Sequence, residues 1–139
     1  MKHLWAMAGL MASLALAPSA ASAQHKVVYH VDNASAQGLK GLRSIRNHLD
    51  TDPKAKVTVV ALAEGIDFLL EGAKDAQGNP YIGPIAALAA RGVRFEVCDL
   101  TLRSRNLKRE SFIQEADFTP SGVVRITQLQ SDGHAYIKP

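Results

Sequence analysis

The sequence predicts an α/β fold in which a parallel or mostly parallel sheet of about five strands is covered by helices on both faces. Short β-branched and aromatic runs alternate with segments of helical periodicity along the chain. The run KVTVVALA (residues 56–63) is almost entirely apolar, as expected of a central parallel strand buried on both faces. No internal repeat, low-complexity tract or interdomain linker interrupts this alternation, so a single domain is expected over residues 24–139.

The first part of this domain predicts two strands, each followed by a helix. Residues 26–31 (KVVYHV) are rich in β-branched and aromatic side chains and predict a strand. In residues 37–49, leucine and isoleucine recur at spacings of three and four, which predicts an amphipathic helix. After the strand at 56–63, residues 64–75 (EGIDFLLEGAKD) predict a second helix with one apolar side.

The middle of the chain predicts a loop, a helix and a third strand. Glycine, asparagine and proline in residues 76–81 (AQGNPY) indicate a turn-rich loop. The alanine-rich residues 82–92 predict a helix that stops at Gly92, because glycine favours the left-handed conformation that ends many helices. Residues 93–98 (VRFEVC) predict the third strand, which ends at the single cysteine of the chain.

The last part of the chain predicts further helices and two short strands. Residues 99–116 predict a helix in two pieces, broken near Asn106. Residues 117–120 (DFTP) predict a very short fourth strand, and residues 121–133 predict a helix that ends at a glycine. Residues 134–139 (HAYIKP) predict a final strand at an edge of the sheet.

Residues 1–23 predict a secretory signal peptide. A positive charge at Lys2 precedes the apolar run 5–17, and residues 21–23 (ASA) give the small-x-small pattern that signal peptidase accepts. A short membrane anchor is the alternative, but a span needs about 20 apolar residues and this run is shorter. We therefore expect a periplasmic protein, cleaved before Gln24, without stable membrane insertion after cleavage.

The charge of the chain indicates no polyanionic partner. The formal net charge is only +3, the basic residues are scattered, and aromatic residues are few. A nucleic-acid surface normally combines a basic stripe with stacking aromatic side chains. No nucleic-acid partner is therefore expected, and the export signal supports the same conclusion.

Cys98 is the strongest candidate for a chemical role. In open parallel sheets, ligands and reactive groups gather beyond the carboxyl ends of the strands, and Cys98 ends the predicted third strand. A helix starting directly after it would favour the thiolate, and Arg103 or Arg105 could add positive potential, whereas Asp99 would oppose it.

Other polar residues fall at the same predicted edge and at the ends of neighbouring strands. The segment DNAS follows the first strand and AEG follows the second. Asp32, Asn33 and Glu64 are therefore candidates to support Cys98 or to line a crevice beside it.

Several alternatives remain open at this point. One cysteine cannot form an intrachain disulfide, but it could be a buried packing residue or could form an interchain bridge. Glu64 and Asp67 could form an acid/base pair, although acidic residues also favour the first turn of a helix. No nucleotide-binding or serine-hydrolase motif occurs, so no cofactor is expected. The histidines lack the pair spacing of a metal site, so no metal is expected; they are His25, His30, His48 and His134.

The residues 24–139 as a whole resemble the DsrE/DsrF-like family, and in particular its small exported branch. The most specific parts are ARGVRFEVC with the basic segment that follows it, and the C-terminal PSGVV…LQ…G-AYIKP stretch. The resemblance implies a three-layer, Rossmann-like α/β/α sandwich and assembly as a homotrimer or hexamer. It also implies that Cys98 is the counterpart of the cysteine on which sulfur-relay relatives carry a persulfide.

The leading hypothesis is therefore a periplasmic sulfur carrier that holds sulfane sulfur on Cys98 and exchanges it with a donor and an acceptor thiol protein. Sulfur-relay relatives that serve tRNA are cytoplasmic, so that role is not expected for an exported chain. The alternative is a non-catalytic oligomeric module that binds a small ligand beside residues 32–35 and 63–65, with Cys98 packed in the interior.

Overall fold

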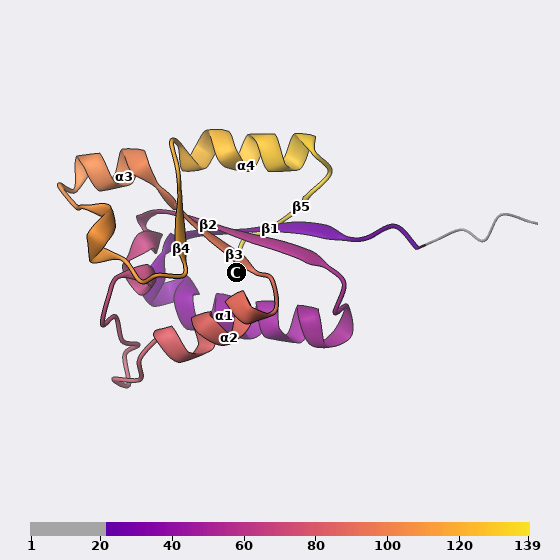
Figure 1. The fold of residues 1–139 in the computed structure, drawn as a ribbon, viewed down its shortest axis with the longest axis horizontal. Coiled ribbons are helices and arrows are strands. Elements are labelled where there is room, and N and C mark those ends of the chain that lie inside the picture. The colour runs from indigo at the N-terminus through magenta and orange to yellow at the C-terminus, as the bar shows by residue number, and fades with distance from the viewer. Residues whose placement is uncertain (1–21) are drawn as a thin grey trace, which may run out of the picture.

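The computed structural model describes residues 22–139, and the predicted signal peptide therefore lies outside the described residues except for its last two. Five strands form one sheet in the order β4-β3-β2-β1-β5, and every adjacent pair is parallel (Figure 1). The strands are β1 (Lys26–Asn33), β2 (Lys56–Glu64), β3 (Arg94–Cys98), β4 (Ala116–Thr119) and β5 (Ala135–Ile137). The helices are α1 (Ala34–Thr51), α2 (Ile82–Ala90), α3 (Asp99–Ser104) and α4 (Gly122–Ser131), with short 3-10 helices η1 (Gly65–Leu69) and η2 (Arg109–Ser111).

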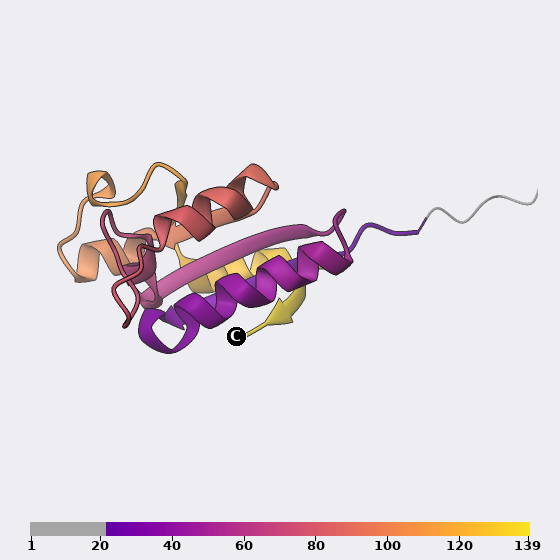
Figure 2. The ribbon, with the colours of Figure 1, turned by 90° about the horizontal axis from the view of Figure 1, so that it is seen from below.

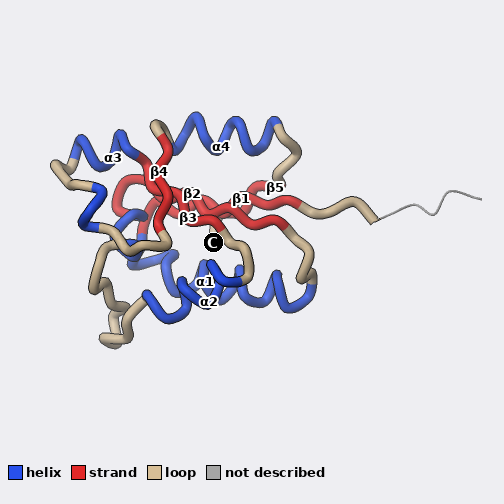
Figure 3. Tube along the Cα trace, in the orientation of Figure 1, coloured by secondary structure: helices blue, strands red, loops and turns tan. Residues whose placement is uncertain are grey.

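The helices lie in two layers with the sheet between them. Helices α1 and α2 lie together on one side of the strands, and α3 and α4 lie on the other, as Figure 3 shows. Figure 2, turned by a right angle, shows α1 running alongside the strands over most of their length. The structure is thus the predicted three-layer α/β/α sandwich with a parallel, five-stranded sheet.

Side chains alternate between the two faces of the central strands, and both faces are buried. This explains the uninterrupted apolar run of β2: Val59 faces the larger core, while Val60 faces the smaller core under α4. On β3, Phe95 and Val97 belong to the core beneath α1 and α2. The residue at the end of β3, Cys98, therefore points to the α4 side of the sheet.

The predicted helix at residues 64–75 is wrong for most of its length. Only η1 forms, and the chain then turns at Gly72, whose φ is +73°. Gly65 lies so close to β1 that a Cβ atom there would be 2.0 Å from the carbonyl oxygen of Val31. This close crossing redirects the chain before a regular helix can continue.

The predicted helix at residues 99–116 is correct only in its first part. Helix α3 ends at Ser104, and Asn106 has a φ of +51°, which confirms the break near that residue. The second piece is only the 3-10 helix η2 and turns, and it leads into β4. Leu70 and Phe112 pair as an isolated bridge, so tertiary pairing replaces the expected helix.

The remaining predicted elements are present with shifted ends. Helix α1 starts three residues earlier than predicted because Asn33 caps it, its side chain accepting the backbone N–H of Ala36 at 3.0 Å. The final strand β5 lies at a sheet edge beside β1, as expected. Within residues 22–139, no helix has both the length and the apolar character required to cross a membrane.

Candidate functional site

Cys98 lies at the end of the strand between β2 and β4, and only 5% of its surface is exposed. Its Sγ accepts a hydrogen bond from the backbone N–H of Gly122 at 3.2 Å. Gly122 is the first residue of α4, so the sulfur lies against the N-terminal end of a ten-residue helix. The exposed peptide N–H groups and the dipole at that end stabilise negative charge.

The close approach of α4 to the sulfur depends on glycine at position 122. A Cβ atom there would be 2.9 Å from Cδ2 of Leu62 and 3.2 Å from Cβ of Cys98. Ser121 caps the helix, with its hydroxyl accepting the N–H of Val124 at 3.4 Å. The PSG sequence therefore places an unobstructed helix end directly on Cys98.

Thr101, in the first turn of α3, is a second hydrogen-bond partner of the Cys98 sulfur. Its hydroxyl oxygen accepts the backbone N–H of Ala63 at 3.0 Å. Ala63 has a φ of +50°, an uncommon conformation for a non-glycine residue, and this bond holds it in place. A hydroxyl that accepts one bond still has its own proton to donate, so Thr101 can donate to the Cys98 sulfur.

These contacts decide the acidity of the thiol. Burial raises the pKa of Cys98, but hydrogen bonds from the backbone of Gly122, from the backbone and hydroxyl of Thr101 and from the backbone of Leu100 together lower the pKa below its ordinary value. The site thus favours the thiolate form, which is the nucleophilic form of cysteine.

The two arginines proposed to assist Cys98 do other things. Arg105 donates to Asp67 at 2.6 Å and to the carbonyl of Ala63 at 3.4 Å, so it braces the backbone beside Thr101 rather than the sulfur. Arg103 lies in the last turn of α3 and is exposed, away from the helix end that carries Cys98.

The acidic neighbour of Cys98 is offset by a residue that the sequence did not single out. Arg109 forms two hydrogen bonds with the carboxylate of Asp99, at 2.6 and 3.2 Å. Its guanidinium also lies 4.8 Å from the ring centre of Phe118. The expected opposition of Asp99 to a thiolate is therefore reduced by this ion pair.

Asp32 and Asn33 have structural roles at the end of β1. Asp32 binds the amine of Lys138 and accepts the side-chain N–H of Gln37 at 2.9 Å. The hydrogen bond from Lys138 is the main reason that the pKa of Asp32 is lowered. Asn33 caps α1. Among residues 22–139, no hydrogen bond joins either residue to Cys98.

Glu64 lines a separate hollow of about 460 Å³ at the carboxyl edge of the sheet. Asn33, Ser35 and Tyr81 are among its other lining residues, whereas Cys98 is not. The crevice predicted beside residues 32–35 and 63–65 is therefore present, but it is distinct from the sulfur. Asp67, the proposed acid/base partner of Glu64, is ion-paired with Arg105 instead.

The histidines have separate local partners. His25 binds Asp52 at 2.7 Å and His30 binds the hydroxyl of Tyr136 at 2.6 Å. His48 shares a hydrogen bond with Tyr29, and the ring N–H of His134 donates to the carbonyl of Leu129. Among residues 22–139, no three His, Cys, Asp or Glu side chains cluster as metal ligands.

The residues that the sequence interpretation missed are Thr101, Gly122 and Arg109. Gly122 was visible as part of the Pro-Ser-Gly helix start, but its contact with Cys98 spans 24 residues. Thr101 reaches Ala63 across 38 residues. The local pattern therefore marked a helix start without showing which strand end it would meet.

Comparisons with known proteins agree with this architecture. The family model described as DsrE/DsrF-like family matches residues 11–139. The chain is similar to MTH1491, a protein of unknown function from Methanobacterium thermoautotrophicum, with 29% identity and a TM-score of 0.75, covering 84% of this chain and 100% of that chain. It is also similar in fold to the ychN protein from E. coli, with 14% identity, a TM-score of 0.68 and the same coverages. A comparison with curated proteins gave no match.

Proposed function

This chain belongs to the DsrE/DsrF-like family, and from that membership, which indicates a sulfur-relay type of function, we propose that it carries sulfane sulfur as a persulfide on Cys98. Its expected export makes the periplasm the proposed place of action. The proposed partners are a low-molecular-weight sulfur donor and an acceptor thiol protein.

The observation that carries this proposal is the hydrogen bonding of the Cys98 sulfur. A buried cysteine that served only for packing would be surrounded by apolar groups, which raise a thiol pKa. Cys98 instead accepts the N–H of Gly122 at a helix start, and its pKa is lowered despite burial. The same donors that stabilise a thiolate would stabilise the anion of a persulfide.

The proposed transfer needs no oxidant. The Cys98 thiolate attacks the sulfane sulfur of the donor, and a new S–S bond forms at Sγ. The bond between the sulfane sulfur and the rest of the donor breaks, and the remainder leaves with the electron pair, as a polysulfide or hydrosulfide anion one sulfur shorter from a polysulfide, or as sulfite from thiosulfate. The acceptor thiolate then attacks the outer sulfur and restores Cys98 as a thiolate.

The burial of Cys98 limits which molecules can react with it. With 5% of the residue exposed, a small inorganic donor fits the site better than a folded protein. Once the persulfide has formed, its outer sulfur extends about 2 Å beyond Sγ. This added reach makes the loaded form more accessible to an acceptor protein than the free thiol is. An interchain disulfide would need Sγ itself at the surface, and the burial argues against it.

Intact-mass measurement tests the proposal. Incubation with polysulfide or thiosulfate should add the mass of one sulfur atom to the protein, and a reductant should remove it. Because Cys98 is the only cysteine in the chain, Cys98→Ser is a direct control and should keep its original mass. A Cys98→Ser protein that gains sulfur to the same extent would contradict the proposal.

One observation favours a second candidate function, which is the binding of a small ligand without catalysis. The hollow beside Asn33 and Glu64 has a volume of about 460 Å³, within the range of small-molecule pockets. Thiol titration of the folded protein separates the two functions. If Cys98 reacts only after denaturation, it is a packing residue and the hollow is the better candidate site.

A further inference from the structure

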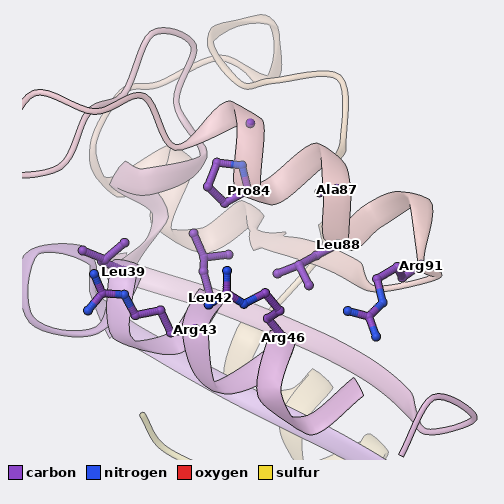
Figure 4. Close-up of a pocket in the computed structure, with 9 residues that line it drawn as sticks. Leu39, Leu42, Arg43, Arg46, Pro84, Ala87, Leu88 and Arg91 are labelled. Atoms are coloured by element: carbon purple, nitrogen blue, oxygen red, sulfur yellow. The ribbon is translucent and has the colours of Figure 1, made fainter. Parts of the chain in front are cut away.

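A groove separates α1 from α2 on the outer side of that helical layer, and it is unconnected with the chemistry of Cys98. Its volume is about 500 Å³. Figure 4 shows side chains from both helices converging on it. The residues that line it are Leu39, Leu42, Arg43, Arg46, Gly83, Pro84, Ala87, Leu88 and Arg91. Cys98 points to the opposite face of the sheet, where it contacts Gly122.

The lining of the groove comes from one face of each helix, and most of it is apolar. On α1 the lining residues recur at intervals of three and four, which places them on one helical face, and α2 repeats this arrangement. Leu42 and Leu88 are buried at its base, each 4% exposed. Gly83 and Ala87 have small side chains, so α2 leaves this space unfilled.

The charges of the groove are all of one sign. Arg43, Arg46 and Arg91 line it, and no acidic residue does. Arg91 is paired with Asp50 at 2.8 Å. Within residues 22–139, Arg43 and Arg46 have neither an ion pair nor a side-chain hydrogen bond among the interactions of the structure. Two guanidinium groups are therefore left without an ion-pair partner beside an apolar surface.

A neighbouring acid, Asp75, forms no ion pair with these arginines in the described part of the chain, although hydrogen bonds from Asn79 and Gln77, together with the charge of Arg43, lower the pKa of Asp75. Asp75 lines an adjoining hollow that shares Arg43 with the groove. Its carboxylate accepts the backbone N–H groups of Gln77 and Asn79, each at 2.9 Å, and the Asn79 side chain at 3.2 Å. These bonds hold Asp75 within its own loop.

We propose that this groove binds an organic monoanion with an unbranched apolar chain, of the medium-chain fatty-acid class. The carboxylate would lie between the guanidinium groups of Arg43 and Arg46, which suit it because guanidinium and carboxylate form paired, charge-assisted hydrogen bonds. The alkyl chain would cover Leu42 and Leu88. A volume of about 500 Å³ lies in the range of pockets that hold small organic ligands.

The geometry favours this ligand over a second copy of the chain or another protein. The hollow combines buried leucines with two arginines that have no ion-pair partner among residues 22–139, which matches a small amphipathic anion.

Calorimetric titration of the purified protein with decanoate tests this assignment. Decanoate should bind, while decanol, which lacks the charge, and acetate, which lacks the chain, should bind at least about tenfold more weakly. The Arg43→Gln/Arg46→Gln double variant should lose about tenfold or more in decanoate affinity. The Lys40→Gln/Lys108→Gln variant removes the same charge from outside the groove and should bind as the parent does.

A second variant tests the apolar part of the groove. Ala87 is exposed, so Ala87→Leu should fold normally while filling the groove, and it should abolish decanoate binding. The proposal is overturned if decanoate does not bind at millimolar concentration, if decanol binds equally well, or if the arginine variant and its control lose affinity alike. A change of oligomeric mass in the arginine variant, with decanoate affinity unchanged, would overturn it in favour of a subunit interface.

The result is independent of the sulfur-carrier proposal. Cys98→Ser should retain decanoate binding, and the arginine double variant should still gain one sulfur atom from polysulfide. If one proposal fails its test, the other is still decided by its own measurement.

Discussion

The sulfur of Cys98 is held by one donor that is 24 residues away, in α4, and by donors of the helix turn that directly follows it. Gly122 approaches from α4, and Thr101 approaches from the first turn of α3. Burial by itself raises the pKa of a thiol, and here the hydrogen bonds outweigh it. The reactivity of this residue is therefore a property of its hydrogen-bond donors and not of its position at a strand end alone.

Removing the hydroxyl of Thr101 should raise the pKa of Cys98, because one donor to the thiolate is lost. The pH dependence of alkylation by iodoacetamide reports this change. In the parent protein the midpoint should lie below the ordinary value of a cysteine thiol, and in Thr101→Val it should move upward.

The same substitution should also destabilise the fold by about 1–3 kcal/mol, since the N–H of Ala63 loses its acceptor. Thr127→Val is a suitable control because Thr127 is an exposed threonine of α4 whose hydroxyl bonds only within that helix. Equal alkylation midpoints in the parent and in Thr101→Val would show that the hydroxyl does not act on the sulfur.

At the scale of elements, α4 is attached to the sheet by a small apolar cluster and by a partly buried ion pair. Ile126 and Leu129 pack on Val28 and Val60. Arg125 forms hydrogen bonds at 2.7 and 2.9 Å with Glu96, a residue that is only 3% exposed. These contacts fix the register of α4 on β3, which in turn places its first N–H on the sulfur.

The contact between α4 and β3 should fail when position 122 gains a side chain. In Gly122→Ala the new Cβ would meet Leu62 and Cys98, so the Leu62 side chain or the helix start must shift. Chemical denaturation should show a loss of about 1–3 kcal/mol, as is typical of overpacking. The bond from Gly122 to Sγ should weaken too, so the alkylation midpoint should rise.

Gly83→Ala provides the matched control, since a Cβ at position 83 meets nothing within 4 Å. In a helix this change should be neutral or stabilising by up to about 1 kcal/mol. If Gly122→Ala were as stable as Gly83→Ala, the close packing of α4 on Cys98 would be wrong.

At the scale of the whole molecule, residues 136–139 contact β1 and α1. Tyr136 binds His30, and Lys138 binds Asp32. Pro139 lies against Gly41 of α1, 3.3 Å from where a Cβ would be. The AYIKP sequence thus joins the final strand to the first strand and the first helix.

The ion pair between Lys138 and Asp32 predicts that the stability of the folded protein depends on pH. The hydrogen bond from Lys138 is the main cause of the lowered pKa of Asp32, so the folded state favours the carboxylate. Stabilisation is therefore present above the ordinary Asp pKa of about 3.9 and is lost as the pH falls through the lower folded-state value. In Asp32→Asn, thermal unfolding should show a deficit near pH 7 that disappears in acid.

The deficit should be about 1 kcal/mol or less, because both side chains are partly exposed to solvent. Glu71→Gln changes an exposed carboxylate elsewhere and should show no such pH-dependent deficit. A deficit of the same size in acid would mean that the ion pair is not its source. Assembly as a homotrimer or hexamer remains a prediction at this scale, to be checked by light scattering.

The sequence by itself determined the α/β alternation, the strands buried on both faces and the position of Cys98 at a strand end. These follow from composition and periodicity, which act over a few residues. Its errors at residues 64–75 and 106–116 lie where Gly65 crosses β1 and where Leu70 pairs with Phe112. Close crossings of this kind are not encoded in local periodicity.

Only the tertiary structure decided which groups surround the sulfur and which do not. Strand order and helix packing bring Gly122 to Cys98, Thr101 to Ala63 and Arg105 to Asp67. It also sets α1 beside α2, so that Arg43 and Arg46 line an apolar groove. The physical reason is that these contacts join residues distant in sequence, and their geometry is fixed only when the sheet and both helical layers pack together.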